Sequence, residues 1–361
     1  MIKYIAMYLP QYYPVEENNR WYGEGFTEWT NVAKARPLFR GHYQPHIPKD
    51  LGFYDLRLKE TRLAQANLAR EYGVQAFCYW HYWFGNGKRI LEMPFREVVK
   101  DKEINFPFCL AWANETWEKK LWDKNVKNEV ILEQTYPGRE DIINHFYSLL
   151  EAFRDPRYFR VNGKLFFVVY KPMKAPIMKE MISIWRELAM KEGLGEFLFV
   201  GGDYACRDKD KILSMGFDCI YDDNVMNIHH DLSMMTKVRL YIQRNYLHMP
   251  TVFKYKDAIE HMIIPEDCAN DVFPMIAPNW DHSPRSGRRS TILVDSTPKL
   301  FDQLLSNVEN AVKDKPDERK IVLIRAWNEW GEGNYLEPDL QYGRQYLEVL
   351  KKHVRQSENE K

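Results

Sequence analysis

Two glutamates three positions apart, Glu329 and Glu332, are the strongest candidates for catalytic groups in this sequence. They lie in the segment WNEWGEG at 327–333, directly after an apolar run. Such a pair suits glycosidic bond cleavage, because one carboxylic acid can protonate the leaving oxygen while an ionised one acts as base or nucleophile. A neighbouring negative charge helps to separate the two pKa values, and hence the two roles.

The glycines at 331 and 333 permit a tight turn that could direct both carboxylates into one cleft. A helix N-terminus, where Glu favours the helix dipole, is the alternative interpretation. That alternative explains Glu332, but it does not explain Trp327 or the pair Asn328 and Glu329 at a strand end. We therefore predict an acid/base pair.

Eight short apolar runs alternate with stretches of helical periodicity, as in βα units. The strands and helices predicted from this pattern would hold the glutamate pair in place. The runs are residues 3–9, 74–80, 107–112, 165–170, 197–201, 219–221, 273–277 and 321–326. Predicted helices include 58–71, 140–153, 177–191, 256–263, 298–312 and 341–353. Eight nearly continuous apolar strands predict an α/β protein with a closed (β/α)8 TIM barrel rather than an open doubly wound sheet.

No linker or break in composition divides the chain, so residues 1–361 are predicted to form a single barrel domain. Two long segments decorate it, a first βα loop at 11–55 and an insertion at 222–271. Loops of this length usually carry function.

Barrel enzymes place reactive groups at the C-terminal ends of their strands, and polar and aromatic residues gather at those points in this sequence. Aromatic faces stack on the C–H faces of sugars, which predicts a cleft for a carbohydrate. From strand-end position, the predicted substrate contacts are Tyr8, Gln11, His81, Trp83, Trp112, Asn114, Glu115, Tyr170, Asp203, Trp280, Trp327 and Asn328.

The composition favours no charged macromolecule as partner, because 51 basic side chains balance 51 acidic ones. We predict no nucleic-acid binding, and no apolar run approaches the roughly 20 residues of a membrane span. The start of the chain lacks the pattern of a signal peptide, and the five cysteines contain no CxxC pair. Both features favour a cytoplasmic protein with reduced cysteines in its core, although a chain trimmed of an export signal would look the same.

No metal ion or cofactor is predicted. His42 and His46 have the spacing of a helical metal pair, but Pro45 lies between them. The glycines at 85 and 87 precede Lys88 without the GxxxxGK[ST] spacing of a phosphate loop.

The segment WNEWGEG, followed by LEP at 336–338, resembles the WbsX-like proteins, a family associated with polysaccharide biosynthesis. The resemblance runs along the whole chain through GFTEWTNV at 25–32, PLFRGH at 37–42, QPH at 44–46, LGFYD at 51–55 and WANE at 112–115. That group is in turn similar to glycoside hydrolase family 99, the retaining endo-α-mannosidases, which share the barrel and a Glu-Trp-x-Glu-Gly segment.

In family 99 the first Glu of this segment deprotonates the sugar's 2-hydroxyl, which attacks the anomeric carbon, and the second protonates the leaving group. The resemblance therefore implies Glu329 as base, Glu332 as general acid and net retention through an anhydro-sugar. It also implies a polysaccharide substrate with α-linked mannose-type or related deoxyhexose units. Gly331 stands where family 99 commonly has His, a departure that bears on which sugar is bound.

Two alternatives belong to other functional classes. One is a glycosyltransferase or accessory protein that helps to build a surface polysaccharide. Its metal-dependent form would use an Asp-x-Asp motif after a strand, but the match at 208–210 opens a predicted helix, and the GxGxxG fingerprint is absent. The other is a carbohydrate-binding barrel without turnover, against which the retained Glu329 and Glu332 argue.

Overall fold

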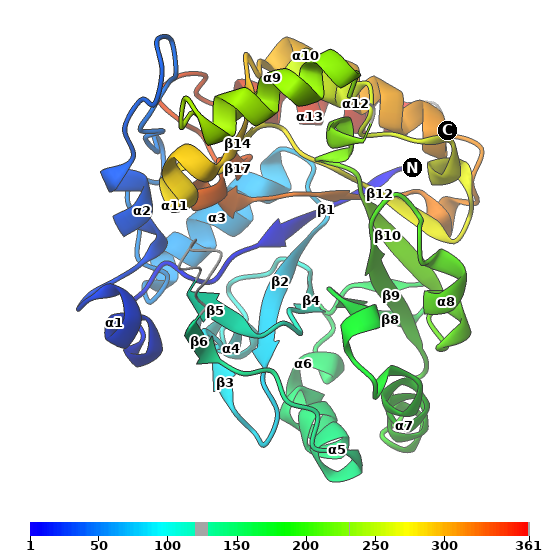
Figure 1. The fold of residues 1–361 in the computed structure, drawn as a ribbon. Helices are drawn as coiled ribbons and strands as arrows, with labels where there is room; N and C mark the ends of the chain where they lie inside the picture. The colour runs from blue at the N-terminus through cyan, green and yellow to red at the C-terminus, as the bar shows by residue number, and fades with distance from the viewer. Residues whose placement is uncertain (120–128, 231, 360–361) are drawn as a thin grey trace.

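The computed structural model describes residues 1–119, 129–230 and 232–359 of the chain. Its centre is a ring of parallel strands (Figure 1), which pair in the order β1, β15, β12, β10, β9, β8, β4 and β2, with β2 returning to β1. They are β1 (Lys3–Tyr8), β2 (Ala76–Trp83), β4 (Phe108–Trp112), β8 (Lys164–Val169), β9 (Phe197–Asp203), β10 (Cys219–Asp223), β12 (Val272–Ile276) and β15 (Ile321–Ile324). The predicted (β/α)8 TIM barrel is confirmed, and each apolar run is a strand.

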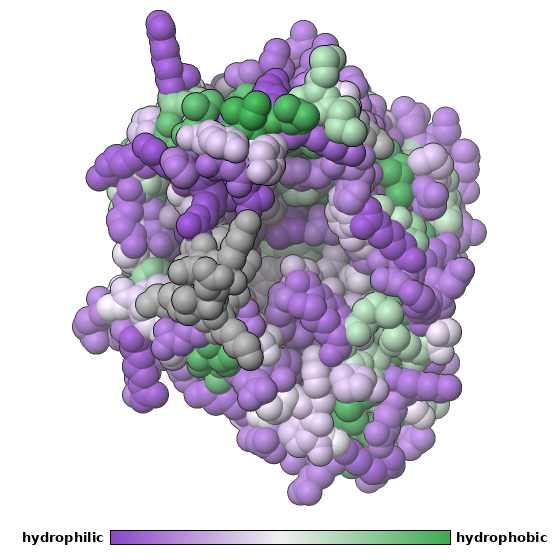
Figure 2. Space-filling view, in the orientation of Figure 1, coloured by the Kyte–Doolittle hydropathy of each residue, from purple (hydrophilic) through white to green (hydrophobic). Residues whose placement is uncertain are grey.

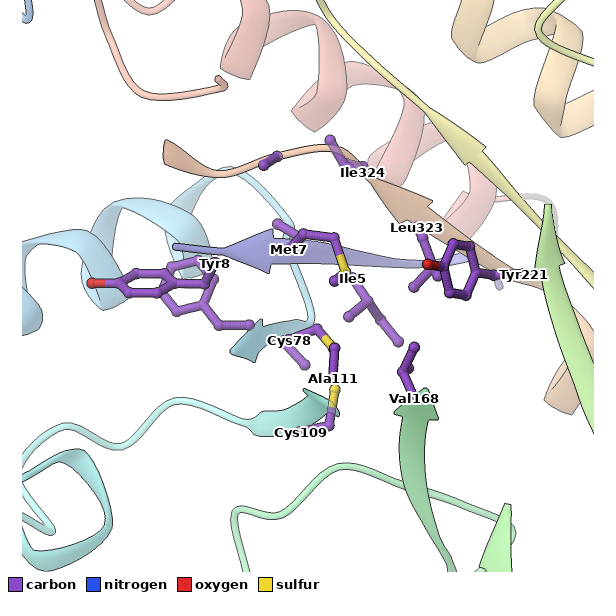
Figure 3. Packing of buried hydrophobic residues seen from close by; sticks show 14 of the residues in the cluster. Ile5, Met7, Tyr8, Cys78, Cys109, Ala111, Val168, Tyr221, Leu323 and Ile324 are labelled. Carbon is purple, nitrogen blue, oxygen red and sulfur yellow. The ribbon is translucent and has the colours of Figure 1, made fainter. Parts of the chain in front are cut away.

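The strands are buried on both faces, which explains why their sequences are nearly continuous apolar runs. One face fills the barrel and the other meets the surrounding helices. Figure 3 shows Cys78 and Cys109 side by side in the interior, while the Tyr8 ring extends away from them. Of the five free cysteines, Cys206 is half-buried and Cys268 is exposed, so the prediction of a core position was wrong for Cys268.

The helices that follow the strands include α3 (Lys59–Glu71), α7 (Met178–Lys191) and α12 (Pro298–Val312), as predicted. The predicted helix at 140–153 is divided into α5 (Arg139–Ser148) and α6 (Leu150–Arg154), and that at 256–263 shortens to α10 (Tyr255–Ile259). The last helix, α13 (Gln345–Asn359), begins later than predicted, because Gly343 adopts a left-handed φ of 57° that an α-helix does not accept.

Both predicted long segments contain secondary structure. The first loop holds α1 (Glu16–Tyr22) and α2 (Glu28–Lys34), and the insertion holds η2 (Asn227–His229), α9 (Met234–Asn245), β11 (Thr251–Lys254) and η3 (Pro265–Cys268). A small second sheet joins β11 to β14 (Thr291–Val294) and β14 to β13 (Trp280–Asp281). It therefore links the insertion to the segment after β12.

The remaining elements are short. They are β3 (Arg89–Ile90), α4 (Met93–Lys100), β5 (Trp117–Lys119), β6 (Glu129–Leu132), β7 (Arg160–Val161), η1 (Pro172–Lys174), α8 (Lys209–Ser214), α11 (Ser283–Ser286), η4 (Gly287–Arg289), η5 (Asp317–Arg319), β16 (Asn328–Glu329), η6 (Trp330–Glu332) and β17 (Asn334–Tyr335). Within the described ranges, no helix combines the length and the apolar character that crossing a bilayer requires.

Candidate active site

A cavity of about 410 Å³ lies at the C-terminal ends of the barrel strands. Its walls come from the ends of β1, β2 and β15, from the residues after β4 and β8, and from α2 and α11. Both predicted catalytic residues, Glu329 and Glu332, line it. Other lining residues include Met7, Gln11, Tyr22, Phe26, Glu28, Trp80, Tyr82, Glu115, Trp117, Tyr170, Arg285 and Arg325.

A short hairpin presents the two carboxylates. Glu329 ends β16, which pairs with β17, and Glu332 ends the turn η6 between them. Gly333 adopts a left-handed φ of 60°, and a Cβ atom there would lie 2.7 Å from the backbone of Asp281. Asn328 fastens the hairpin to the barrel, because its side chain accepts from the Leu9 amide at 2.8 Å and donates to the Leu9 carbonyl at 3.0 Å.

The guanidinium of Arg285 connects the two carboxylates. It donates to Glu332 at 2.5 Å, to Glu329 at 2.9 Å and, through Nε, to Glu28 of α2 at 3.0 Å. A second guanidinium, Arg325, donates to Glu332 at 3.3 Å and pairs with Asp223. These four carboxyl groups outnumber the two guanidinium groups, an excess of negative charge that would stabilise positive charge developing on a sugar ring.

The two carboxylates have pKa values shifted in opposite directions. Burial raises the pKa of Glu329 to about 7, and the charges of Glu332 and Glu28 add to this while Arg285 opposes it. Burial also acts to raise the pKa of Glu332, but Arg285, Arg325 and His282 outweigh it and hold that pKa well below the usual range. In the free site near neutral pH, Glu329 therefore holds the proton more readily than Glu332 does. This order is opposite to the one that the family 99 roles require at the start of the reaction.

Gly331 faces helix α2. A Cβ atom at this position would overlap Oε2 of Glu28 and lie 3.0 Å from Nε of Arg285. The carboxylate of Glu28 thus occupies the space into which a side chain at 331 would extend. An acidic group from the first loop therefore lies at the position of the segment where the resemblance to family 99 would place a His.

The segment that carries Arg285 is held in place by the first loop. Asp281 of β13 accepts from Gln44 at 2.6 Å and from His42 Nε2 at 2.7 Å, and its other oxygen accepts from the Ser283 amide. Because the Leu38 amide donates to Nδ1 of His42, the proton of that ring lies on Nε2. His42 is therefore an anchor for Asp281, and in the described part of the chain no three His, Cys, Asp or Glu side chains form a group suited to a metal ion.

Gln11, Glu115 and Tyr170 are the predicted substrate contacts that line the cavity. Asn114 lines an adjoining groove of about 650 Å³, which shares Tyr22, Glu115, Trp117 and Tyr170 with the cavity. In this groove Glu115 accepts from Lys171 at 2.8 Å and from Lys174 at 2.5 Å. The cleft therefore continues beyond the carboxyl pair.

Six other predicted contacts lie behind the wall of the cavity, and the structure does not bring them into its lining. Tyr8 donates to Gln65 of α3, and His81 lies 2.8 Å from the buried His145. Their strand neighbours Met7, Trp80 and Tyr82 face the cavity instead, because successive side chains of a strand point to opposite faces. The other four are Trp83, Trp112, Trp327 and Asn328, which are all buried in the interior.

Asp203 and Trp280 do not line either hollow. The Asp203 carboxylate accepts from the amides of Tyr204 and Asp208 in the turn before α8. The ring of Trp280 supports the site indirectly, because the guanidinium of Arg325 lies 4.8 Å from its centre. Both were predicted as substrate contacts, and in the structure each has a partner within the protein.

Sequence reasoning missed Glu28, Arg285 and Arg325. Glu28 lies in the segment GFTEWTNV, and Arg325 is the charged residue of the last apolar run, so both carried a signal. Arg285 lies after a strand end where Trp280 attracted the prediction of a substrate contact. Its pairing with Glu28, 257 positions away, has no signature in the local sequence.

The chain is a closed TIM barrel with a carboxyl pair after its last strand, and its fold is glycoside hydrolase-like. The family model described as "Glycosyltransferase WbsX" matches residues 4–350, and the chain belongs to this family. It is 35% identical over 350 residues to the uncharacterized protein WxcX of Xanthomonas campestris pv. campestris. The match covers 96% of this chain and 49% of WxcX, so the chain spans about half the length of that curated relative.

Solved structures share the fold at low identity. A protein described as "Glycoside hydrolase-like protein" aligns over 98% of this chain and 94% of its own, with a TM-score of 0.61 and 15% identity. The GH99 endo-alpha-mannosidase of Bacteroides thetaiotaomicron, in complex with BIS-TRIS-propane, aligns over 99% of this chain and 98% of its own, with a TM-score of 0.58 and 14% identity. These likenesses establish the architecture.

Proposed function

We propose that the chain is a retaining glycosidase that cleaves α-linked mannose-type or related deoxyhexose bonds in a polysaccharide. The observation that carries this proposal is the carboxyl pair Glu329 and Glu332, which lines the cavity and shares the guanidinium of Arg285. The fold shared with the bacterial endo-alpha-mannosidase supports it, and so does the resemblance of the segment WNEWGEG to family 99.

The cavity and groove suit an oligosaccharide. A volume of about 410 Å³ falls within the range of small-molecule sites. The rings of Trp80, Tyr82 and Trp117 provide flat faces on which sugar C–H groups can stack. The adjoining groove, with Lys171 and Lys174 at Glu115, would hold further sugar units of a chain.

In the proposed reaction, Glu329 accepts the proton of the substrate's 2-hydroxyl, whose oxygen attacks the anomeric carbon. Glu332 protonates the departing glycosidic oxygen, and water then opens the anhydro-sugar with net retention. In the free site Glu329 binds a proton more readily than Glu332 does, so the substrate must reverse this order. A hydroxyl that donates to Glu329 stabilises its ionised form, and a glycosidic oxygen that accepts from Glu332 stabilises its protonated form.

Two variants test this assignment once a panel of defined polysaccharides has identified a substrate. Glu329→Gln and Glu332→Gln should each lower kcat by about 10²–10⁴-fold, as expected for loss of an acid or a base. Against an aryl glycoside with a good leaving group, Glu332→Gln should recover most of its activity, because protonation is no longer needed. Glu329→Gln should remain slow with both substrates.

The exposed Glu140→Gln serves as the matched control and should retain full activity. Full activity of either active-site variant would contradict the assignment of this carboxyl pair as catalytic acid and base. Recovery by Glu329→Gln in place of Glu332→Gln would reverse the two roles. NMR reports the anomeric configuration of the first product. An inverted configuration would exclude the retaining mechanism.

The alternative function is a transferase or accessory protein in surface polysaccharide biosynthesis, which the description of the family as a glycosyltransferase favours. The experiment that separates the two is incubation with nucleotide sugars and an acceptor glycan. Transfer without hydrolysis of any glycan in the panel would support the alternative and overturn the glycosidase.

A further inference from the structure

Helix α9 stands on the surface of the insertion, and none of its residues is buried. Met234, Val238, Tyr241 and Ile242 lie on one helical face, because the last three follow the first by four, seven and eight positions. Their side chains are exposed, with Tyr241 at 60% and Val238 at 51%. Figure 2 shows hydrophobic surface along the upper edge of the molecule, where Figure 1 places α9.

Basic side chains border this apolar face. At about 100° per residue, Lys237 and Arg244 fall on one side of it and Arg239 on the other. All three are exposed, and none pairs with a carboxylate among the residues that the structure describes. Residues 232–256 contain no Asp or Glu, so no acidic side chain of this segment offsets their charge.

The opposite face of α9 holds the helix on the protein. Leu240 packs against the hydrophobic core, and the helix contacts β11. Through β14, this strand is joined to β13, the strand that precedes α11 and Arg285. The apolar face is therefore presented outward from a fixed base.

We propose that the apolar face of α9 and its three basic neighbours, Lys237, Arg239 and Arg244, bind the surface of an anionic lipid membrane. An interfacial helix of this kind lays its apolar face about 5–10 Å into the boundary between headgroups and acyl chains, with Lys and Arg at the phosphates. Charge complementarity selects this occupant. A second copy of the chain, docked through the same face, would bring these three basic groups against three more.

The test uses the full chain and sedimentation with vesicles. The protein should sediment with mixed vesicles that contain both phosphatidylglycerol and phosphatidylcholine, but not with vesicles of phosphatidylcholine alone. Added salt should weaken this binding. The triple variant Lys237→Glu, Arg239→Glu, Arg244→Glu should lower the partition coefficient by about tenfold or more. The double variant Val238→Gln, Ile242→Gln should lower it while leaving the charge unchanged.

The matched control reverses three exposed lysines elsewhere, as Lys179→Glu, Lys191→Glu, Lys313→Glu, and should bind as the unchanged protein does. Equal loss in this control would assign binding to net charge and overturn the proposal. Absence of binding to anionic vesicles would overturn it as well. So would a dimer, seen by sedimentation velocity, that Val238→Gln, Ile242→Gln dissociates, because it would assign the face to a second copy.

Discussion

The guanidinium of Arg285 offsets the negative charge of three carboxyl groups in the site. Its three donors reach Glu28, Glu329 and Glu332, which come from the first loop and from the hairpin after the last strand. Without this cation, the carboxyl groups would face one another with Arg325 as their remaining guanidinium partner. Arg285 thus lowers the pKa of both members of the carboxyl pair.

Replacing Arg285 by Gln should therefore move the whole pH profile of kcat/KM to higher pH, by about one unit or more. The base would need a higher pH to ionise, and the acid would keep its proton to a higher pH. The activity at the optimum should fall by about tenfold or more, since the pair loses its common donor. The measurement is a pH–rate profile, with the exposed Arg288→Gln as the control of equal charge. An unchanged profile in Arg285→Gln would contradict this role.

At the scale of elements, the close approach of α2 to η6 depends on Gly331. Because a Cβ atom there would overlap the Glu28 carboxylate, Gly331→Ala should lower the free energy of unfolding by about 1–3 kcal/mol. Adding Glu28→Ala should recover most of this loss, since it removes the group that is struck. Urea unfolding of the two single variants and the double variant gives the coupling. If the losses of the two single variants simply added in the double variant, overlap with Glu28 would not be the cause of the destabilisation by Gly331→Ala.

The strands could be predicted from sequence, whereas the direction of their terminal side chains could not. Strands that are apolar on both faces show no alternation, so nothing in the sequence distinguished Met7, which faces the cavity, from Tyr8, which faces α3. The carboxyl pair was predictable because its residues are local. Arg285 was not, because its partner Glu28 is brought to it only by the fold.

At the scale of the whole molecule, several carboxyl groups are buried away from the cavity. Burial raises the pKa of Asp267 to about 7, and that of Asp222 to about 6. Asp267 accepts from the Ile264 amide through one oxygen, and the other oxygen has no partner among the described residues. A group with a raised pKa contributes stability that is complete below its unfolded pKa, near about 4, and is lost as pH rises through its folded pKa.

Asp267→Asn, which has no such proton to lose, should therefore gain stability relative to the unchanged protein as pH rises from about 4 to about 8. The relative gain should reach up to about 4 kcal/mol. The difference between the two proteins is the quantity to measure, by urea unfolding, because His81 and His145 are buried with lowered pKa values and affect absolute stability in the opposite sense. The exposed Asp314→Asn serves as the control of equal charge. A flat difference for Asp267→Asn would contradict the raised pKa.

The pairing of β1 with β15 has a consequence for the order of events during synthesis. One edge of β1 can meet β2 early, but its other edge stays open until residues 321–324 emerge. At ribosomal rates this interval lasts on the order of tens of seconds, during which an unpaired edge is available to other chains. Glu329 and Glu332 follow that last strand closely along the chain. The barrel can therefore close only when the two glutamates are also about to be synthesised. An incomplete chain has neither a closed barrel nor the carboxyl pair.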